Sequence, residues 1–176
     1  MSKVIIITPV KDSLHTTSRT INAISKATGE FKYYVFNDFS QPETKEYLEK
    51  VKEEFDFQLI NLEDITNNPS PNYKMVLEIA QELALENNCP LIIIESDVLI
   101  KPDTLSGLIE ILNTKPKPGL IGAITVDESG NYNFPYTFEK DKSGEILNTS
   151  HSLSFCCTLI SLPFLNSFSF EELLII

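Results

Sequence analysis

Short apolar runs alternate with helical patterns along the first 126 residues, and this alternation constrains the fold more than any other feature of the chain. The runs cover residues 4–8, 33–36, 57–60, 91–94 and 120–126. They are rich in β-branched, leucine and aromatic residues and show little polar alternation, which is typical of strands buried on both faces. Strands separated by helices predict an α/β fold with a parallel sheet and right-handed crossovers.

Helical periodicity fills the intervals between these runs. Apolar residues recur at three- and four-residue spacing over 14–24, 47–55, 73–86 and 105–112. After residue 126 the pattern is less regular, with strands expected at 130–137 and 153–162. We therefore expect a single domain over 1–176, made of a regular half (1–126) and an irregular half (127–176).

Charge and composition exclude several classes of protein. The chain carries a net charge of −11, whereas binding to a nucleic-acid backbone needs a basic face, so no nucleic-acid partner is expected. No apolar run approaches the roughly 20 residues that span a bilayer, and the first apolar run is too short for a signal peptide. These features predict a cytoplasmic protein, or one peripheral to the inner face of a membrane.

The three cysteines predict neither a disulfide nor a zinc site. Cys156 and Cys157 are adjacent, and Cys89 lies far from them in sequence. Neighbouring cysteines rarely meet disulfide geometry, and no CxxC spacing is present. All three are expected to be small buried apolar side chains.

Polar residues follow three of the predicted strands. The first strand ends at Thr8 and Pro9, the second is followed by Asn37 and Asp38, and the fourth by 95–97 (Glu-Ser-Asp). In a doubly wound sheet, ligands bind beyond the carboxyl ends of the strands. We therefore expect these segments to border one crevice.

The acidic pair in 95–97 is the most informative of these segments. On an extended chain, Glu95 and Asp97 project to one side, and two neighbouring carboxylates repel unless a cation or a proton lies between them. Such oxygen ligands suit Mg²⁺ or Mn²⁺. The alternative is a solvated turn after a strand. Asp38 has two interpretations as well, a nucleoside-facing acid or a turn residue.

The order of motifs along the chain resembles that of family 2 glycosyltransferases with the GT-A fold. Residues 4–12 (VIIITPVKD) resemble the opening strand and its TPVYN-like turn, and 36–40 (FNDFS) resemble the VDDGS turn. Lys74 lies in a segment like the GKxxAL helix start. Residues 95–98 (ESDV) fall at the DxD metal motif, and 101–105 (KPDTL) resemble the helix that continues it.

The resemblance implies a mainly parallel, Rossmann-like sheet flanked by helices, and metal-dependent, inverting transfer of a sugar from a nucleotide-diphospho-sugar. The donor is expected to be a UDP-sugar, and the acceptor a glycan or a lipid-linked sugar. Mn²⁺ or Mg²⁺ would be held by Asp97 and Glu95. The donor-binding residues it implies are Thr8, Pro9, Asp38, Lys74, Glu95, Ser96 and Asp97.

The resemblance also implies a role for each half of the chain. Residues 1–126 would bind the nucleotide-sugar, and 127–176 would form part of the acceptor side. A peripheral membrane contact or a contact between copies of the chain is compatible with this arrangement.

The chain departs from the family pattern in three places. Asn37 replaces the first Asp of the VDDGS turn, and Glu95 replaces the first acid of DxD. The ED motif that supplies the catalytic base is expected beyond Glu172, so the sequence predicts that this base segment is lacking. Glu171 and Glu172 fit the position before the base and are its weak candidates.

Two alternatives to an active transferase stay open. The first is a nucleotide-sugar-binding module without turnover. The second is a Mg²⁺-dependent signalling α/β domain, a class to which the irregular half of the chain does not correspond.

Overall fold

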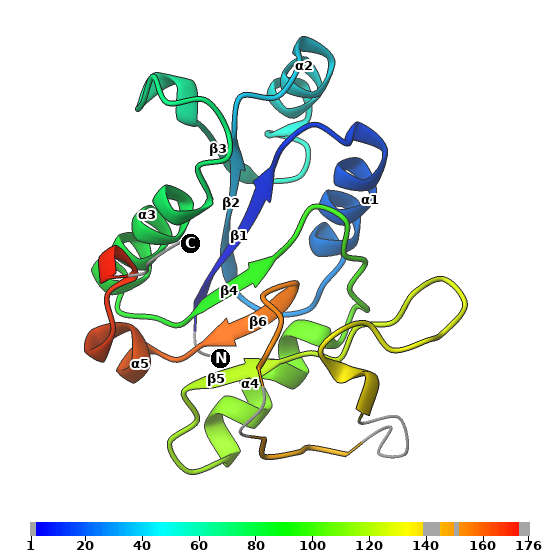
Figure 1. Cartoon of the computed structure of the whole chain (residues 1–176), viewed down its shortest axis with the longest axis vertical. Helices are drawn as coiled ribbons and strands as arrows, with labels where there is room; N and C mark the ends of the chain where they lie inside the picture. The colour runs from blue at the N-terminus through cyan, green and yellow to red at the C-terminus, as the bar shows by residue number, and fades with distance from the viewer. Residues whose placement is uncertain (1–2, 139–144, 150–151, 173–176) are drawn as a thin grey trace.

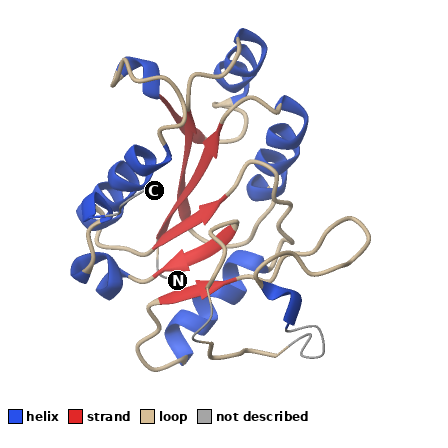
Figure 2. Cartoon of the chain, in the orientation of Figure 1, coloured by secondary structure: helices blue, strands red, loops and turns tan. Residues whose placement is uncertain are grey.

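The sheet is mixed, has six strands and carries helices on both faces (Figures 1 and 2). A computed structural model of the chain describes residues 3–138, 145–149 and 152–172. The strand order is β3-β2-β1-β4-β6-β5. The strands are β1 Val4–Val10, β2 Phe31–Asn37, β3 Phe57–Asn61, β4 Leu91–Ile94, β5 Leu120–Gly122 and β6 Cys157–Ile160.

The first four strands in the chain are parallel to one another, and β6 is antiparallel to both of its neighbours, β4 and β5. The mainly parallel sheet is therefore as predicted. The parallel direction brings the carboxyl ends of β1, β2 and β4 to the same edge of the sheet.

Two helical layers cover the sheet. The helices are α1 Leu14–Ser25, α2 Pro42–Val51, α3 Tyr73–Glu86, α4 Thr104–Thr114 and α5 Leu162–Ser167, with short 3₁₀ turns η1 Leu62–Asp64, η2 Tyr136–Phe138 and η4 Phe170–Glu172. The first core cluster packs α1, α2 and α4 on one face, and the second packs α3, α5 and η4 on the other (Figure 1). Among the described residues, no helix is long and apolar enough to cross a membrane.

Strand β1 shows how the apolar runs form two cores. Val4 and Ile6 belong to the cluster beneath α1, whereas Ile5 and Ile7 belong to the cluster beneath α3. Successive side chains of a strand point to opposite faces, so a continuous apolar run is buried on both sides. The strand also includes Pro9, where the sequence suggested that it would end; its pairing with β4 has already ended at Ile7.

The second half of the chain differs from the sequence expectation. Strand β5 ends at Gly122 rather than at residue 126, and 130–137 is not a strand but includes one isolated bridge, Val126 to Tyr132, and the start of η2. A Cβ placed on Gly122 would lie 2.8 Å from the hydroxyl of Tyr136. The buried Tyr136 side chain thus fills the space beside the last residue of β5, where the chain leaves the sheet.

Candidate functional site

The end of β2 is held directly against the end of β1. Val10 pairs with Asn37 in the parallel ladder, and the amide of Asp38 donates to the carbonyl of Val10 at 2.8 Å. The structure therefore places Asn37 and Asp38 beside the end of β1, at the carboxyl edge of the sheet. Thr8 and Pro9, which the sequence expected after the first strand, lie within β1.

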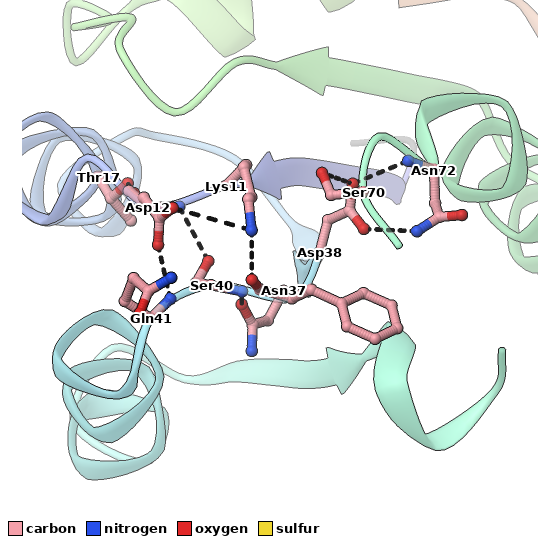
Figure 3. Close-up of polar contacts among 10 residues, drawn as sticks. Lys11, Asp12, Thr17, Asn37, Asp38, Ser40, Gln41, Ser70 and Asn72 are labelled. Atoms are coloured by element: carbon pink, nitrogen blue, oxygen red, sulfur yellow. Dashed lines mark hydrogen bonds and ion pairs between the residues drawn. The ribbon is translucent and has the colours of Figure 1, made fainter. Parts of the chain in front are cut away.

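Asp38 is buried and links β2 to the segment that leads into α3 (Figure 3). Its Oδ2 accepts hydrogen bonds from the Ser70 hydroxyl and the Asn72 amide, both at 2.8 Å, and its Oδ1 accepts from Nδ2 of Asn72 at 2.7 Å. A carboxylate with three donors is strongly anchored. Asp38 thus fixes the start of α3 at the edge of the sheet.

Asn37 is turned toward β3. Its Nδ2 donates to Oδ1 of Asn61 at 2.9 Å, and its Oδ1 accepts from the amide of Ser40 at 3.2 Å. The side chain is fully buried. The asparagine that replaces the family's first aspartate therefore supports the turn after β2.

A second set of contacts ties the β1–α1 turn to the turn after β2 (Figure 3). The Asp12 amide donates to the Ser40 hydroxyl at 2.9 Å, and the Gln41 amide donates to Oδ1 of Asp12 at 2.6 Å. The Lys11 ammonium donates to the carbonyl of Phe39. Asp12 has a φ of 58°, in the left-handed region where Asp is tolerated. Sequence reasoning gave Asp12 no role, because its partners lie 28 and 29 residues away.

Glu95 and Asp97 lie in a turn rather than on extended chain. Strand β4 ends at Ile94, and the amide of Val98 donates to the Glu95 carbonyl at 3.1 Å. The prediction that both carboxylates project to one side assumed an extended backbone, and that premise was wrong. Glu95 is partly buried, whereas Asp97 is exposed and lines a cavity.

Glu95 lies beside Cys156 at the start of the neighbouring antiparallel segment. The Glu95 amide donates to the carbonyl of Cys156 at 3.0 Å, and the thiol of Cys156 lies 3.6 Å from Oε2 of Glu95. Burial raises the pKa of the Glu95 carboxyl, the thiol partly opposes that rise, and the charge of Asp97 adds to it.

Tyr73 completes this cluster from the first residue of α3. Its hydroxyl is buried and has no hydrogen-bond partner among the residues that the structure describes. Burial, followed by the charges of Glu95 and Cys156, raises the pKa of Tyr73 above its ordinary value. Sequence reasoning missed Tyr73 and Cys156 as site residues, and Cys156 is only partly buried where full burial was expected. No spacing in the sequence marks either residue.

Two predicted donor-binding side chains are engaged within the protein. The hydroxyl of the buried Thr8 accepts from that of Tyr33 at 2.9 Å on the α1 side of the sheet. The Lys74 ammonium donates to the carbonyl of Glu171 at 2.7 Å and lies 3.8 Å from Glu78. A donor contact by Thr8 or Lys74 therefore stays a prediction.

The remaining predicted residues are less constrained by their surroundings. Ser96 lies in the turn between the two acids, and Pro9 lies on β1 opposite Phe36. Glu171 and Glu172 are exposed in η4, which packs on α3 through the buried Phe170.

The carboxylates at the end of β4 are suitable ligands for a hard divalent cation. Within the described ranges, no group of three or more His, Cys, Asp or Glu side chains is placed to hold a metal. Mg²⁺ and similar ions typically take one or two carboxylates and complete their shell with water and the phosphates of a ligand. The exposed Asp97 and the adjacent Glu95 fit this pattern.

Solved structures with the same fold include two proteins in complex with nucleotide-sugars. TarS from S. aureus (residues 1–349, in complex with UDP-GlcNAc) is 20% identical with a TM-score of 0.52, over 63% of this chain and 31% of that chain. The mannosyltransferase PcManGT from Pyrobaculum calidifontis, in complex with GDP-Man and Mn²⁺, is 16% identical with a TM-score of 0.55, over 70% and 35%. The chain thus spans about a third of these structures. A search of curated protein sequences gives no match.

A family profile agrees with the fold. The profile described as "Glycosyl transferase family 2" matches residues 5–167. This range contains all six strands apart from the first residue of β1, and it leaves out the η4 turn. Together with the GT-A architecture, this match establishes the kinship that the motifs suggested. The chain belongs to glycosyl transferase family 2.

Proposed function

We propose that this protein is a metal-dependent glycosyltransferase domain that binds a nucleotide-diphospho-sugar at the carboxyl ends of β1, β2 and β4. The observation that carries the proposal is the placement of Asp38, Glu95 and Asp97 along this one edge in a family 2 chain. The complexes of TarS with UDP-GlcNAc and of PcManGT with GDP-Man and Mn²⁺ support it. A UDP-sugar is the favoured donor.

The protein groups would divide the work of binding the donor. Asp97 would hold Mn²⁺ or Mg²⁺ from its exposed position, with Glu95 as the second carboxylate. Such an ion neutralises the charge that grows on the leaving diphosphate. Asp38 would keep the start of α3 in place at the nucleoside end of the site. Pro9 would form part of the floor beneath the donor.

Transfer would pass through an oxocarbenium-like state, as in glycoside hydrolysis. A carboxylate base would take the proton of the acceptor hydroxyl and give inversion at the anomeric carbon. Glu171 and Glu172 are the candidates for this base, and both have exposed side chains.

A second candidate function is nucleotide-sugar binding without turnover. Among the described residues, no third acidic, histidine or cysteine side chain forms a metal-binding group with Glu95 and Asp97. An inverting reaction needs a base close to the reacting carbon. The distance of such a base from the β4 turn decides between the two candidates.

Two measurements test these candidates in sequence. Calorimetry with UDP, UDP-GlcNAc, GDP and ADP in Mn²⁺ should give clear binding of at least one uridine nucleotide and weaker binding of ADP. Release of UDP from the preferred donor, with the sugar passing to an added acceptor hydroxyl or to water, is then followed over time with excess protein and separates a transferase from a binding module. Absence of binding by any nucleotide would overturn both candidates.

A further inference from the structure

The two edge strands of the sheet, β5 and β3, differ in how they are protected. Strand β5 has three residues, and the side chains of Tyr136 and Leu153 lie beside its Gly122. A short, covered edge strand is a poor partner for another chain. Strand β3 has five residues, and it pairs with β2 over its whole length, from Phe57 to Asn61.

The outer edge of β3 presents unpaired backbone groups. Apart from the ladder with β2, the backbone of 58–60 forms no hydrogen bond with the part of the chain that the structure describes. Residues 57–61 (FQLIN) contain no charged residue or proline, and their ladder with β2 has no bulge. Natural edge strands commonly carry one of these protecting features, because free N–H and C=O groups are a template for a further strand. The edge of β3 is therefore suited to pairing with another strand.

A second copy of β3 is a complementary partner for this edge. A net charge of −11 opposes self-association, so a contact between copies needs a surface where like charges do not meet. Antiparallel pairing centred on Leu59 would place Leu59 opposite Leu59, with Gln58 opposite Ile60. Because successive side chains of a strand alternate between faces, each such pair lies on one face of the joined sheet. The pairing thus brings apolar and amide side chains together without a charge.

Helix α2 covers the sheet beside this edge. Its buried Leu48 and Val51 belong to the core cluster that also contains Phe57 of β3. A two-fold axis perpendicular to the sheet, which makes two copies of β3 antiparallel, also makes two copies of α2 antiparallel. The surface that the two copies would share therefore includes α2.

Two charged side chains of α2 are left without a partner. Lys45 and Glu49 are engaged within the chain, Lys45 with Glu63 of η1. Glu46 and Lys50, one turn apart, are exposed and form no ion pair or hydrogen bond with any described residue. Both line a cavity of about 760 Å³ that Glu63 also borders. On antiparallel copies of α2, Glu46 of each copy can meet Lys50 of the other.

We propose that β3 and α2 form an interface between two copies of this chain. The two sheets join through antiparallel β3 strands, and Glu46 and Lys50 form reciprocal ion pairs across the two-fold axis. Such a contact uses the same surface on both copies, so the assembly closes at two chains. The proposal goes beyond the proposed function and does not depend on it, since β2 and β1 separate β3 from β4 and its acidic turn.

Sedimentation equilibrium of the full chain, without nucleotide or metal, tests the assembly. We expect the average mass to rise with concentration from that of one chain to that of two and no further, because the contact is closed. The mass of a single chain at every concentration up to about 1 mM would overturn the proposal. Continued growth beyond two chains would overturn it as well.

Charge reversals test the place. Glu46→Lys and Lys50→Glu should each weaken the dimer by about tenfold or more, because each turns two ion pairs into two repulsions. An equal mixture of these two variants should dimerise about as tightly as the unmodified chain, since every pair is complementary again. Glu110→Lys and Lys115→Glu, exposed on α4 and at its end, change the net charge equally and should have little effect. Equal losses in variants and controls, or no recovery in the mixture, would overturn the assignment.

Amide hydrogen exchange tests the strand pairing. Exchange in 57–61 should slow as the dimer forms, whereas exchange in 120–122, at the other edge of the sheet, should not change. A dimer without this protection would overturn the β3 contact. Binding of UDP with Mn²⁺ is the separate readout of the proposed function. A dimer that binds no nucleotide leaves this inference standing, whereas nucleotide binding by a chain that stays monomeric overturns this inference alone.

Discussion

Asp38 holds the segment before α3 against the end of β2 through hydrogen bonds from Ser70 and Asn72. An asparagine at this position would keep the shape of the side chain but lose the charge and turn an NH₂ group toward one set of donors. We expect Asp38→Asn to lower the free energy of unfolding by about 2 kcal/mol or more, since hydrogen bonds to charged groups are the stronger ones. Urea unfolding without nucleotide measures this loss.

Asp64→Asn is the control for this variant, because Asp64 is an exposed aspartate in η1. Its change should stay within about 0.5 kcal/mol, as for ordinary surface substitutions. Equal stability of Asp38→Asn and the unmodified chain would contradict the anchoring role.

Glu95 has the opposite effect on stability. Because burial raises the pKa of its carboxyl, the folded state binds more protons than the unfolded state just above the ordinary pKa. Stability then falls as the pH rises through that window, and the cost is fully present above the raised pKa. Glu95→Gln should therefore raise the unfolding midpoint at pH 7 in EDTA, and the gain should shrink on acidification below the ordinary pKa of a glutamate.

The exposed Glu128 provides the comparison, since Glu128→Gln should leave the midpoint nearly unchanged at both pH values. A Glu95→Gln protein that is less stable than the unmodified chain at pH 7 would show that the carboxylate is stabilising there. A gain in stability together with a loss of Mn²⁺-dependent nucleotide binding would identify Glu95 as a residue retained for binding.

Gln81 on helix α3 makes three hydrogen bonds to the end of the described chain. Its Nε2 donates to the carbonyls of Leu165, at 2.7 Å, and Phe168, and its Oε1 accepts from the amide of Phe170 at 3.0 Å. Gln81→Leu would leave these backbone groups unpaired in a buried place. We expect it to lower the free energy of unfolding by about 2 to 4 kcal/mol.

Gln58→Leu is the matched control for Gln81→Leu, because Gln58 is exposed on the edge strand β3. Denaturant unfolding should show little change for this variant. Similar losses in the two variants would mean that the cost comes from the leucine rather than from the lost hydrogen bonds.

Elements with their own local pattern were predictable from the sequence. Helix α3 and strand β4 have the predicted bounds, because a long apolar stripe and a continuous β-branched run are read from neighbours in the chain. The end of β5 was not predictable, since it depends on Tyr136 packing beside Gly122. The antiparallel direction of β6 likewise depends on pairing with β4, more than 60 residues earlier.

The candidate site divides along the same line. The edge position of Asp38, Glu95 and Asp97 followed from where the strands end. The contact of Lys74 with Glu171 did not, because the two residues are 97 positions apart. Cys156 was missed for the same reason, as it meets Glu95 only through the pairing of two segments 61 positions apart. Tyr73 was missed because no pattern in the sequence marks the burial of its hydroxyl.

At the scale of the whole molecule, the carboxyl edge of the sheet separates two environments. On the α3 side lie Asp38, Tyr73 and Glu95, which are buried or partly buried. On the α1 side, the exposed Asp97 lines the cavity that also contains Arg19. The carboxylates of Glu95 and Asp97 would repel an anionic diphosphate at this edge unless a cation lies between them. Metal-dependent donor binding is the central expectation that follows.

Calorimetric titration of UDP with Mn²⁺ and with EDTA, on the unmodified chain and on Asp97→Asn and Asp103→Asn, tests this expectation most directly. Asp103 is an exposed aspartate before α4 whose side chain does not cap the helix. We predict that EDTA and Asp97→Asn each weaken binding by at least about tenfold, whereas Asp103→Asn keeps the Mn²⁺ dependence. Equal affinity with Mn²⁺ and EDTA, or loss of binding in Asp103→Asn but not in Asp97→Asn, would contradict the metal-dependent site at the end of β4.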